Sequence, residues 1–399
     1  MAIKITNNNI VTISSTDALK IHILSFFWGV WCILRKFMRE VLYNANPQLK
    51  RDNPPTCLVD TTLGQHSYVK LKGVKLHYLE AGRKNGPVLL LLHGFPDCWI
   101  SWRFQIPVLA EHYRVIALDL KGFGDSDKPE SRKCYRLDVL LSELKELIAA
   151  LGVESCSIVG HDLGALIGWF FVHMHPEMVD KFVSISCPHP NLYWNYLPSS
   201  SIFNTNWIHY SQLPHLPELD ALRDDLNIIN KCFQHLSVKD VSSAYLDAYK
   251  YSFSRKEDWT GPINYYRNLP FWRVNVAVDS DANLRVPVLM MVGNRDSSVH
   301  LESVIKSTDF VDKFSLKVID GAGHFPHQEN PKHVNKILFS FLVGNITPPV
   351  TPAPSGGLVY RMFGAVSSTM KYGNQMMDVV SKRSNGITSK AITVGQGAT

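Results

Sequence analysis

Short apolar runs alternate with longer segments of helical spacing along the middle of the chain. Val69–Leu71 and Val74–Glu80 alternate with period two around Lys72-Gly73, which predicts a β-hairpin. Six near-continuous apolar runs are typical of parallel strands covered on both faces: Val88–Leu92, Val115–Leu118, Ser157–Val159, Phe182–Ile185, Val288–Val292 and Leu316–Ile319. Helical spacing appears between or after these runs, at Leu137–Leu151, at Ala165–His173 and from Asn330-Pro331 onward. This order predicts an α/β protein with a right-handed, mostly parallel central sheet.

The alternation stops between residues 188 and 284, where the periodic pieces have helical spacing. Aromatic residues are frequent there: Tyr193, Trp194, Tyr196, Trp207, Tyr210, Tyr245, Tyr249, Tyr251, Trp259, Tyr265, Tyr266 and Trp272. We predict a helical cap over 188–284, inserted into a core made of residues 53–187 and 285–348. Most of the rings are expected to pack between the cap and the core.

The first 52 residues contain an apolar segment without Asp, Glu, Lys or Arg from Ile21 to Leu34. Counted from Ala18 as a helix it is roughly 25 Å long, close to the ~30 Å hydrocarbon core of a bilayer. The basic cluster Arg35-Lys36-Phe37-Met38-Arg39 follows, without a small-residue cleavage site. We predict an uncleaved membrane anchor at 18–34, with the body in the cytoplasm and the endoplasmic reticulum as the expected membrane. A buried or interfacial helix is the alternative, given His22.

From Pro348 the chain reads PPVTPAPSGG and continues as a tail rich in Ser, Gly and Thr, so we predict disorder over residues 349–399. The whole chain has 399 residues, is 45% hydrophobic and 19% charged, and carries a net charge of +6. Residues 1–52 and 349–399 each carry +4, which leaves −2 for residues 53–348. The slightly acidic body argues against a nucleic-acid-binding surface. Seven widely spaced cysteines without a CxxC pair predict free thiols in place of a disulfide framework or a zinc site.

The clearest chemical signal is Gly160-His161-Asp162-Leu163-Gly164, which lies between an apolar strand and a helix. Small residues on both sides of a central nucleophile are typical of the tight strand–turn–helix called a nucleophile elbow. Here the central residue is Asp162, and a helix N-terminus stabilises a carboxylate as the anion. Such a carboxylate can attack carbon and form an ester. The alternative is that Asp162 only caps the helix.

Two further candidates follow later strands in the chain order nucleophile, acid, histidine that this arrangement uses. Asp296 lies just after Val288–Val292, and His324 lies just after Leu316–Ile319. We predict that His324 activates water while Asp296 fixes its tautomer. The alternatives are an ordinary turn residue and an ordinary loop histidine. His327 forms only a weak HxxH metal pair with His324.

His93-Gly94-Phe95-Pro96 follows the run Val88–Leu92, where an oxyanion hole is expected. The backbone N–H groups of Phe95 and Leu163 are the predicted donors.

These motifs resemble the epoxide hydrolase branch of the α/β-hydrolase family over roughly residues 68–345. The resemblance includes His-Gly-Phe-Pro at 93–96, Asp-Leu-Lys-Gly-Phe-Gly-Asp-Ser at 119–126, Gly-His-Asp-Leu-Gly-Ala at 160–165 and Gly-Pro-Ile-Asn-Tyr-Tyr-Arg-Asn at 261–268. The last motif is the most specific and implies that Tyr266 is a ring-opening tyrosine. The N-terminal segment and Gln212-Leu213-Pro214 resemble the membrane-anchored animal enzymes in particular.

The sequence departs from the family at one cap position. The family uses two cap tyrosines, the first about five residues before the Gln of the Gln-x-Pro segment. Trp207 stands there, and Tyr210 is close by. Either of these substrate-binding candidates can provide a second donor, Tyr210 if the alignment shifts and otherwise the indole N–H of Trp207.

The resemblance implies hydration of a lipophilic epoxide, for example a fatty-acid epoxide or a xenobiotic, to a vicinal diol, in lipid metabolism or detoxification. Asp162 attacks carbon, Tyr266 binds the epoxide oxygen, and water activated by His324 cleaves the ester. No metal or organic cofactor is expected. Two other functions remain open: a dehalogenase on the same scaffold, and a non-catalytic, membrane-tethered lipid-binding module.

Overall fold

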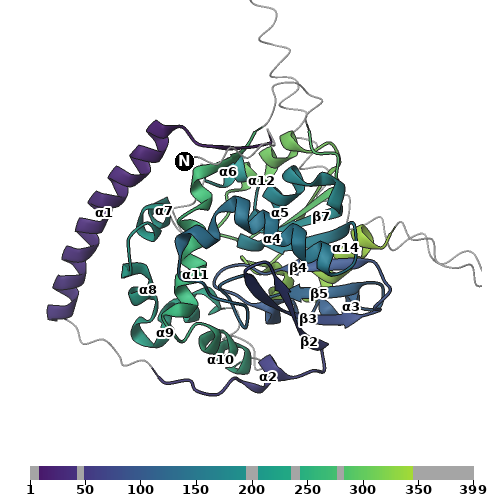
Figure 1. Cartoon of the computed structure of the whole chain (residues 1–399), viewed down its shortest axis with the longest axis horizontal. Coiled ribbons are helices and arrows are strands. Elements are labelled where there is room, and N and C mark those ends of the chain that lie inside the picture. Colours follow the sequence, from purple (N-terminus) through teal and green to yellow (C-terminus); the bar gives the residue numbers. More distant parts are fainter. Residues whose placement is uncertain (1–8, 43–48, 195–204, 235–242, 276–282, 345–399) are drawn as a thin grey trace, which may run out of the picture. The chain divides into compact units, whose positions relative to one another are not determined.

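An eight-stranded sheet forms the centre of the structure, which is a computed structural model describing residues 9–42, 49–194, 205–234, 243–275 and 283–344 (Figure 1). The strand order is β10-β9-β7-β6-β4-β5-β3-β2. The strands are β2 (Gln65–Leu71), β3 (Val74–Gly82), β4 (Val88–Leu92), β5 (Arg114–Leu118), β6 (Cys156–His161), β7 (Val179–Ile185), β9 (Val288–Gly293) and β10 (Phe314–Ile319). In this order the six strands β10-β9-β7-β6-β4-β5 are all parallel to their neighbours. The remaining pairs, β5 with β3 and β3 with β2, are antiparallel. The chain therefore has the mostly parallel α/β sheet that its sequence pattern predicts and the α/β-hydrolase fold that its resemblance to that family implies.

The apolar runs form strands, but one of them is not central. In β4, β6 and β9 every residue is buried, as expected for strands covered on both faces. β10 lies at the edge of the sheet and alternates between more and less exposed residues; Val318, for example, is 48% exposed. The prediction of a strand covered on both faces was wrong for Leu316–Ile319, because a run of four residues does not reveal whether a second neighbour exists.

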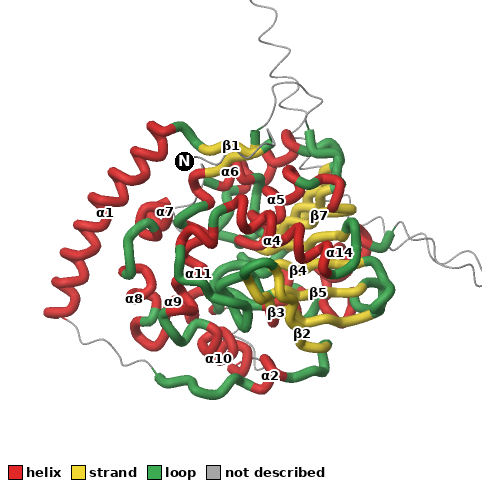
Figure 2. Tube along the Cα trace, viewed as in Figure 1, coloured by secondary structure: helices red, strands yellow, loops and turns green. Residues whose placement is uncertain are grey.

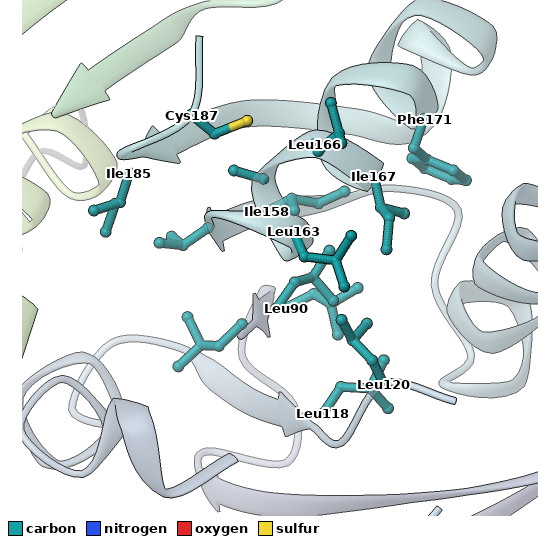
Figure 3. Packing of buried hydrophobic residues seen from close by; sticks show 14 of the residues in the cluster. Leu90, Leu118, Leu120, Ile158, Leu163, Leu166, Ile167, Phe171, Ile185 and Cys187 are labelled. Carbon is teal, nitrogen blue, oxygen red and sulfur yellow. The ribbon is translucent and has the colours of Figure 1, made fainter. Parts of the chain in front are cut away.

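Helices of the core connect and cover the strands (Figure 2). They are α2 (Thr56–Val59), α3 (Ile106–Leu109), α4 (Leu137–Ala150), α5 (Leu163–Met174), α12 (Leu301–Lys306), α13 (Pro326–Glu329) and α14 (Pro331–Leu342), with short 3-10 turns at 99–102, 132–135, 176–178 and 307–310. α5 is apolar on nearly all sides and packs against β6 and β7. Figure 3 shows Leu163, from its first turn, among side chains of the buried cluster that include Leu90 and Ile158. This packing fixes the start of α5 relative to the sheet.

The segment between β7 and β9 contains the inserted helices. They are α6 (Pro190–Tyr193), α7 (Thr205–Ser211), α8 (Leu216–Ala221), α9 (Arg223–Cys232), α10 (Ser243–Ser252) and α11 (Glu257–Tyr266), followed by a 3-10 turn at 269–271 and by β8 (Trp272–Val274). Many of their aromatic rings are buried, including Tyr249, Trp259 and Tyr265. These rings belong to the same hydrophobic cluster as the sheet residues, so the inserted helices and the core share one apolar interior.

The N-terminal residues are joined to the inserted helices. β1 (Ile10–Thr12) pairs antiparallel with β8, and α1 (Ser15–Leu42) packs along α7. On the contact side of α1, Ser25 is buried, and a Cβ added at Gly29 would lie 2.8 Å from Leu213. The remaining surface of α1 exposes Leu19, Ile23, Leu24, Phe26, Phe27, Val30, Trp31, Ile33, Leu34, Phe37 and Met38. Residues Ser15–Met38 are long and apolar enough to cross a membrane, and the tail predicted at 349–399 lies outside the described residues.

Candidate active site

Asp162 occupies a strained turn between β6 and α5. Its backbone has φ 45° and ψ −114°, an unusual conformation for a residue with a side chain. The flanking glycines make this turn possible, because a Cβ at Gly160 would lie 2.5 Å from the Cα of Ala165 and one at Gly164 would lie 2.3 Å from the carbonyl oxygen of Leu92. The sequence motif therefore forms an elbow that projects the Asp162 carboxylate beyond the end of the strand.

Two backbone N–H groups act on the Asp162 carboxylate. The N–H of Phe95 donates to Oδ2 at 3.1 Å, and the N–H of Leu163, at the start of α5, also lowers the pKa of the carboxyl group. Phe95 precedes Pro96 through a cis peptide bond. The predicted oxyanion-hole donors therefore lie together, and the contact with Phe95 distinguishes Oδ2 from Oδ1.

His324 and Asp296 lie on the Oδ1 side of the nucleophile. Nδ1 of His324 donates to Oδ2 of Asp296 at 3.0 Å, and Nε2 of His324 is 3.9 Å from Oδ1 of Asp162. The Asp296 side chain is fully buried, and its Oδ1 accepts the N–H of Ser298 at 2.8 Å. This arrangement leaves Nε2 directed at the nucleophile, as a general base requires.

Burial and neighbouring charges shift the pKa values of the two groups. Burial raises the pKa of Asp162 above its ordinary value of 3.8, although His324 and the two N–H groups act in the opposite direction. Burial by itself lowers the pKa of His324, but the charges of Asp296 and Asp162 and the hydrogen bond to Asp296 outweigh it and raise the pKa to about 9. In the resting protein the pair is therefore a carboxylate beside an imidazolium.

This shift predicts a pH dependence of stability. Because the pKa of His324 is about 9 in the folded chain against an ordinary 6.5, protonation stabilises the fold. That contribution is complete below pH 6.5 and is lost as the pH rises to 9. We expect the Tm of the wild type to fall across this window more than the Tm of His324→Gln, measured by calorimetry. Parallel curves for the two proteins would contradict the assigned pKa.

A cavity of about 260 Å³ lies against Asp162. Its walls include Asp162, Phe95, His324 and Tyr266, together with residues that the sequence did not single out as site residues: Ser186, Tyr193, Lys231, Cys232 and Arg295. No sequence motif marks these five residues. Ser186, however, has φ 54°, and its buried hydroxyl has no partner among the described residues.

Tyr266 reaches the cavity from the last turn of α11. Its backbone carbonyl accepts the side-chain amide of Gln212 at 3.1 Å. The next residue, Arg267, ties α11 to the segment before α8 through bonds to the carbonyls of Ser211 and Leu213 and through an ion pair with Glu218. Burial, followed by the charge of Asp162, raises the pKa of Tyr266 well above its ordinary value. Its hydroxyl therefore stays protonated and can donate.

The two candidates for a second donor differ in position. The ring of Trp207 stacks on Phe95 at 6.1 Å and meets Tyr266 edge-on at 5.6 Å. Tyr210 directs its hydroxyl to a carboxylate oxygen of Asp220. The structure thus brings Asp162, Asp296, His324, Tyr266, Phe95, Leu163 and Trp207 together, but it engages the Tyr210 hydroxyl elsewhere in the cap.

A second buried cluster lies beneath the catalytic loop. Asp97, His161 and His327 place one potential metal ligand each within 4.8 Å of one another. The hydroxyl of Ser101 already joins Asp97 and His327, with bonds of 2.7 and 2.9 Å. Nε2 of His161 donates to the carbonyl of His324 at 2.9 Å, and burial raises the pKa of Asp97 to about 7. His327 therefore lies in a buried polar cluster with Asp97, Ser101 and His161. Through the bond from His161, this cluster supports the backbone of His324.

Comparisons with known proteins agree with this geometry. The family model for the alpha/beta hydrolase fold matches residues 87–331. The chain is 34% identical over 303 residues to Epoxide hydrolase 4 of Homo sapiens, covering 73% of this chain and 83% of the relative. It is 35% identical over 305 residues to Epoxide hydrolase 3 of Xenopus tropicalis, covering 73% and 82%.

Solved structures give the same result. The crystal structure of Bacillus megaterium epoxide hydrolase in complex with an inhibitor matches with a TM-score of 0.60 and 28% identity, covering 69% of this chain and 100% of that one. Epoxide Hydrolase A from Mycobacterium thermoresistibile matches with a TM-score of 0.60 and 26% identity, covering 70% and 98%.

Proposed function

The chain belongs to the epoxide hydrolases of the α/β-hydrolase family and is a hydrolase that acts on epoxides, and we propose that it opens them through a covalent ester on Asp162. One observation carries this proposal. Oδ2 of Asp162 is held by the N–H of Phe95, whereas Oδ1 lies 3.9 Å from Nε2 of His324 on the cavity side. The carboxylate thus has one anchored oxygen and one oxygen available to attack.

In the first step Oδ1 attacks an epoxide carbon and the carbon–oxygen bond of the ring breaks. The electron pair of that bond goes to the epoxide oxygen, which takes a proton from the hydroxyl of Tyr266. An alkoxide is a poor leaving group in water, so a positioned donor lowers the barrier. Oδ2 becomes the carbonyl oxygen of the ester and already lies on the Phe95 N–H.

Before the second step the His324 imidazolium passes its Nε2 proton through solvent to the Tyr266 phenolate, which leaves a neutral imidazole and a phenol. Nε2 of His324 then takes a proton from water, and the water oxygen attacks Cγ of the ester. The charge that develops on Oδ2 is stabilised by the N–H groups of Phe95 and Leu163. Collapse breaks the bond between Cγ and Oδ1, so Oδ1 leaves with the diol. The proton of the new carboxylic acid goes to the departing alkoxide, which completes the diol and restores the Asp162 carboxylate beside the His324 imidazolium. Formation of the ester also removes the negative charge of Asp162, so His324 becomes a more available base.

A panel of epoxides with different chain lengths and ring substituents tests this function. We expect formation of vicinal diols, detected by mass spectrometry, with the purified full chain. Haloalkanes of matched carbon skeleton serve as the comparison for the dehalogenase alternative. Halide release without diol formation would overturn the proposal.

Two cationic residues at the cavity wall, Lys231 and Arg295, support fatty-acid epoxides as the substrate class that we propose. Both are exposed cationic residues at the wall of the cavity, and neither forms an ion pair with another residue in the described ranges. A substrate with an apolar chain and a terminal carboxylate can place the chain in the cavity and the carboxylate near these cations.

Replacing both cations tests this preference. We expect Lys231→Gln with Arg295→Gln to raise KM for an epoxy fatty acid by about threefold to tenfold, because exposed charge pairs contribute little each. The methyl ester of the same epoxide is the matched control, and its KM should stay constant. An equal change for acid and ester would contradict the role of the two charges.

We also propose that the exposed face of α1 anchors the enzyme in a membrane, with the body of the enzyme on the cytoplasmic side. Charges at positions 27 and 31, introduced as Phe27→Lys and Trp31→Lys, should move the protein from the membrane pellet to the supernatant after alkaline extraction. A charge in hydrocarbon costs about 2.5–3.5 kcal/mol. Leu219→Lys, at another exposed apolar residue, is the control. A wild type that is itself fully extracted would contradict the anchor, and markers of the endoplasmic reticulum identify the membrane.

A further inference from the structure

Ring opening by Tyr266 leaves room for a second donor on the epoxide oxygen, and we propose that Tyr193 is this donor. The inference rests on the proposed covalent mechanism. It differs from both sequence-based candidates, because Tyr193 is neither at the family's cap position, where Trp207 stands, nor next to it, as Tyr210 is.

The position of Tyr193 is the first argument. Its side chain lines the same cavity as Asp162, His324 and Tyr266 and is only 9% exposed. It reaches the cavity from α6, which follows β7 of the sheet, whereas Tyr266 comes from α11, the last of the inserted helices (Figure 1). Two hydroxyls on two different elements can bind one oxygen from two sides.

Rigid support is the second argument. His189 caps the start of α6: its Nδ1 accepts the N–H of Asn191, and its ring stacks on Phe310 at 3.8 Å. The Asn191 side chain accepts the N–H of Val274 and donates to its carbonyl, each at 2.8 Å, so α6 is tied to β8. Trp194 packs edge-on against the Tyr193 ring at 4.7 Å. A donor must be held in this way to act without reorganisation during the reaction.

The state of the hydroxyl is the third argument. Burial, followed by the charges of Asp162, Cys187 and Asp296, raises the pKa of Tyr193 well above its ordinary value, so the phenol stays protonated. The two phenols line one cavity, where burial and then the charge of Asp162 are also the largest causes that raise the pKa of Tyr266. No hydrogen bond from the Tyr193 hydroxyl to another residue is seen within the described ranges. Tyr265, a buried neighbour of Tyr266, instead donates to the carbonyl of Lys121 at 2.9 Å and is engaged structurally.

The surroundings of Trp207 explain why a replacement is needed. The Trp207 ring lies flat against Phe95 and edge-on to Tyr266. Trp207 thus packs on Phe95 and Tyr266 and does not line the cavity in the described part of the chain, while the Tyr210 hydroxyl is bound to Asp220. Among the described residues, Tyr193 and Tyr266 are the two phenols in the cavity wall.

The experiment measures ester formation alone. In the His324→Gln background, excess enzyme is mixed with a series of aryl-substituted epoxides that differ in the basicity of the departing oxygen, and the rate of adduct formation is followed by mass spectrometry. We expect Tyr193→Phe to slow this step by about 10²-fold, the effect of removing one positioned donor. The rate should also depend more steeply on the basicity of the departing oxygen, because less proton transfer assists it. Tyr266→Phe should behave in the same way, and the double variant should be slower than either.

Tyr245→Phe is the matched control, because Tyr245 is a half-buried tyrosine of α10 whose ring contacts Arg103 away from the cavity wall. A Tyr193→Phe rate within twofold of this control overturns the inference. If Tyr193→Phe forms the adduct more slowly but with an unchanged dependence on the basicity of the departing oxygen, the inference is also overturned. That result would show that Tyr193 has only a structural role. A steeper dependence in Trp207→Phe or Tyr210→Phe, absent from Tyr193→Phe, would assign the donor to that residue instead. Failure of the His324→Gln background itself to form an ester would refute the covalent mechanism, independently of Tyr193.

Discussion

Asp162→Ala is expected to lower kcat for epoxide hydration by about 10⁴-fold or more, in line with the loss on removing a nucleophile from a serine protease. The substitution removes the attacking oxygen but leaves Tyr266, His324 and the Phe95 N–H in place. Glu329, a carboxylate in the wall of the same cavity, cannot substitute. Its two oxygens accept the N–H groups of Gly323 and Phe325 at 2.7 and 3.0 Å.

Initial rates over the epoxide panel measure this loss, and thermal unfolding serves as the control for folding. We expect the Tm of Asp162→Ala not to fall, because the variant relieves a buried carboxylate whose pKa is already raised by burial. If wild type and variant bind epoxides equally and both hydrate them at the same slow rate, the protein is a binding module and the enzymatic account fails.

His324→Gln is expected to reduce turnover by about 10³-fold or more while an ester accumulates on Asp162. Gln has no basic nitrogen, so water is no longer activated for the second step. The first step uses Oδ1 of Asp162 and the cavity hydroxyls, all of which remain. The enzyme should therefore stop after a single attack on carbon.

Intact mass spectrometry detects the adduct as an increase by the mass of one epoxide, and peptide analysis places it. The double variant Asp162→Ala with His324→Gln is the matched control and should gain no mass. If His324→Gln gains no mass from an epoxide that the wild type hydrates, the ester is not an intermediate.

Much of the core geometry follows from local sequence rules. Gly160 and Gly164 flank Asp162 because any larger residue would collide with the backbone of Ala165 or Leu92. The elbow is therefore visible in the sequence as small residues around the nucleophile. Asp296 and His324 follow neighbouring parallel strands, β9 and β10, and so must emerge at the same edge of the sheet.

The second donor could not be predicted in this way. Tyr193 lies 31 residues after Asp162 in a short helix without a motif, and its access to the cavity depends on contacts with β8 and Phe310 that are distant in sequence. Tyr210 shows the opposite case. It is close to the family position in sequence, but the carboxylate of Asp220, ten residues away, binds its hydroxyl. Side-chain direction on the cap is a tertiary property that spacing does not contain.

The N-terminal segment has one feature that the local sequence predicts and one that depends on tertiary contacts. The absence of charge from Ile21 to Leu34 predicts a long apolar helix, and α1 contains this stretch. The pairing of β1 with β8 joins Ile10 to Val274, and the packing of α1 on α7 brings Ser25 to His209, 184 positions later in the chain. Hydropathy cannot show either contact. The sequence thus reveals the composition of this helix but not the face that it presents to the rest of the protein.

The most direct test of the covalent mechanism is a single turnover of the wild type in H₂¹⁸O. Enzyme in excess over a fatty-acid epoxide is quenched after one cycle, and the diol and the peptide that contains Asp162 are analysed by mass spectrometry. Because Oδ1 leaves with the product and water replaces it, the diol should contain only ¹⁶O and the Asp162 carboxylate should gain one ¹⁸O atom. An ¹⁸O atom in the diol of this first turnover, with none in Asp162, would show that water attacks the epoxide directly and would contradict the account.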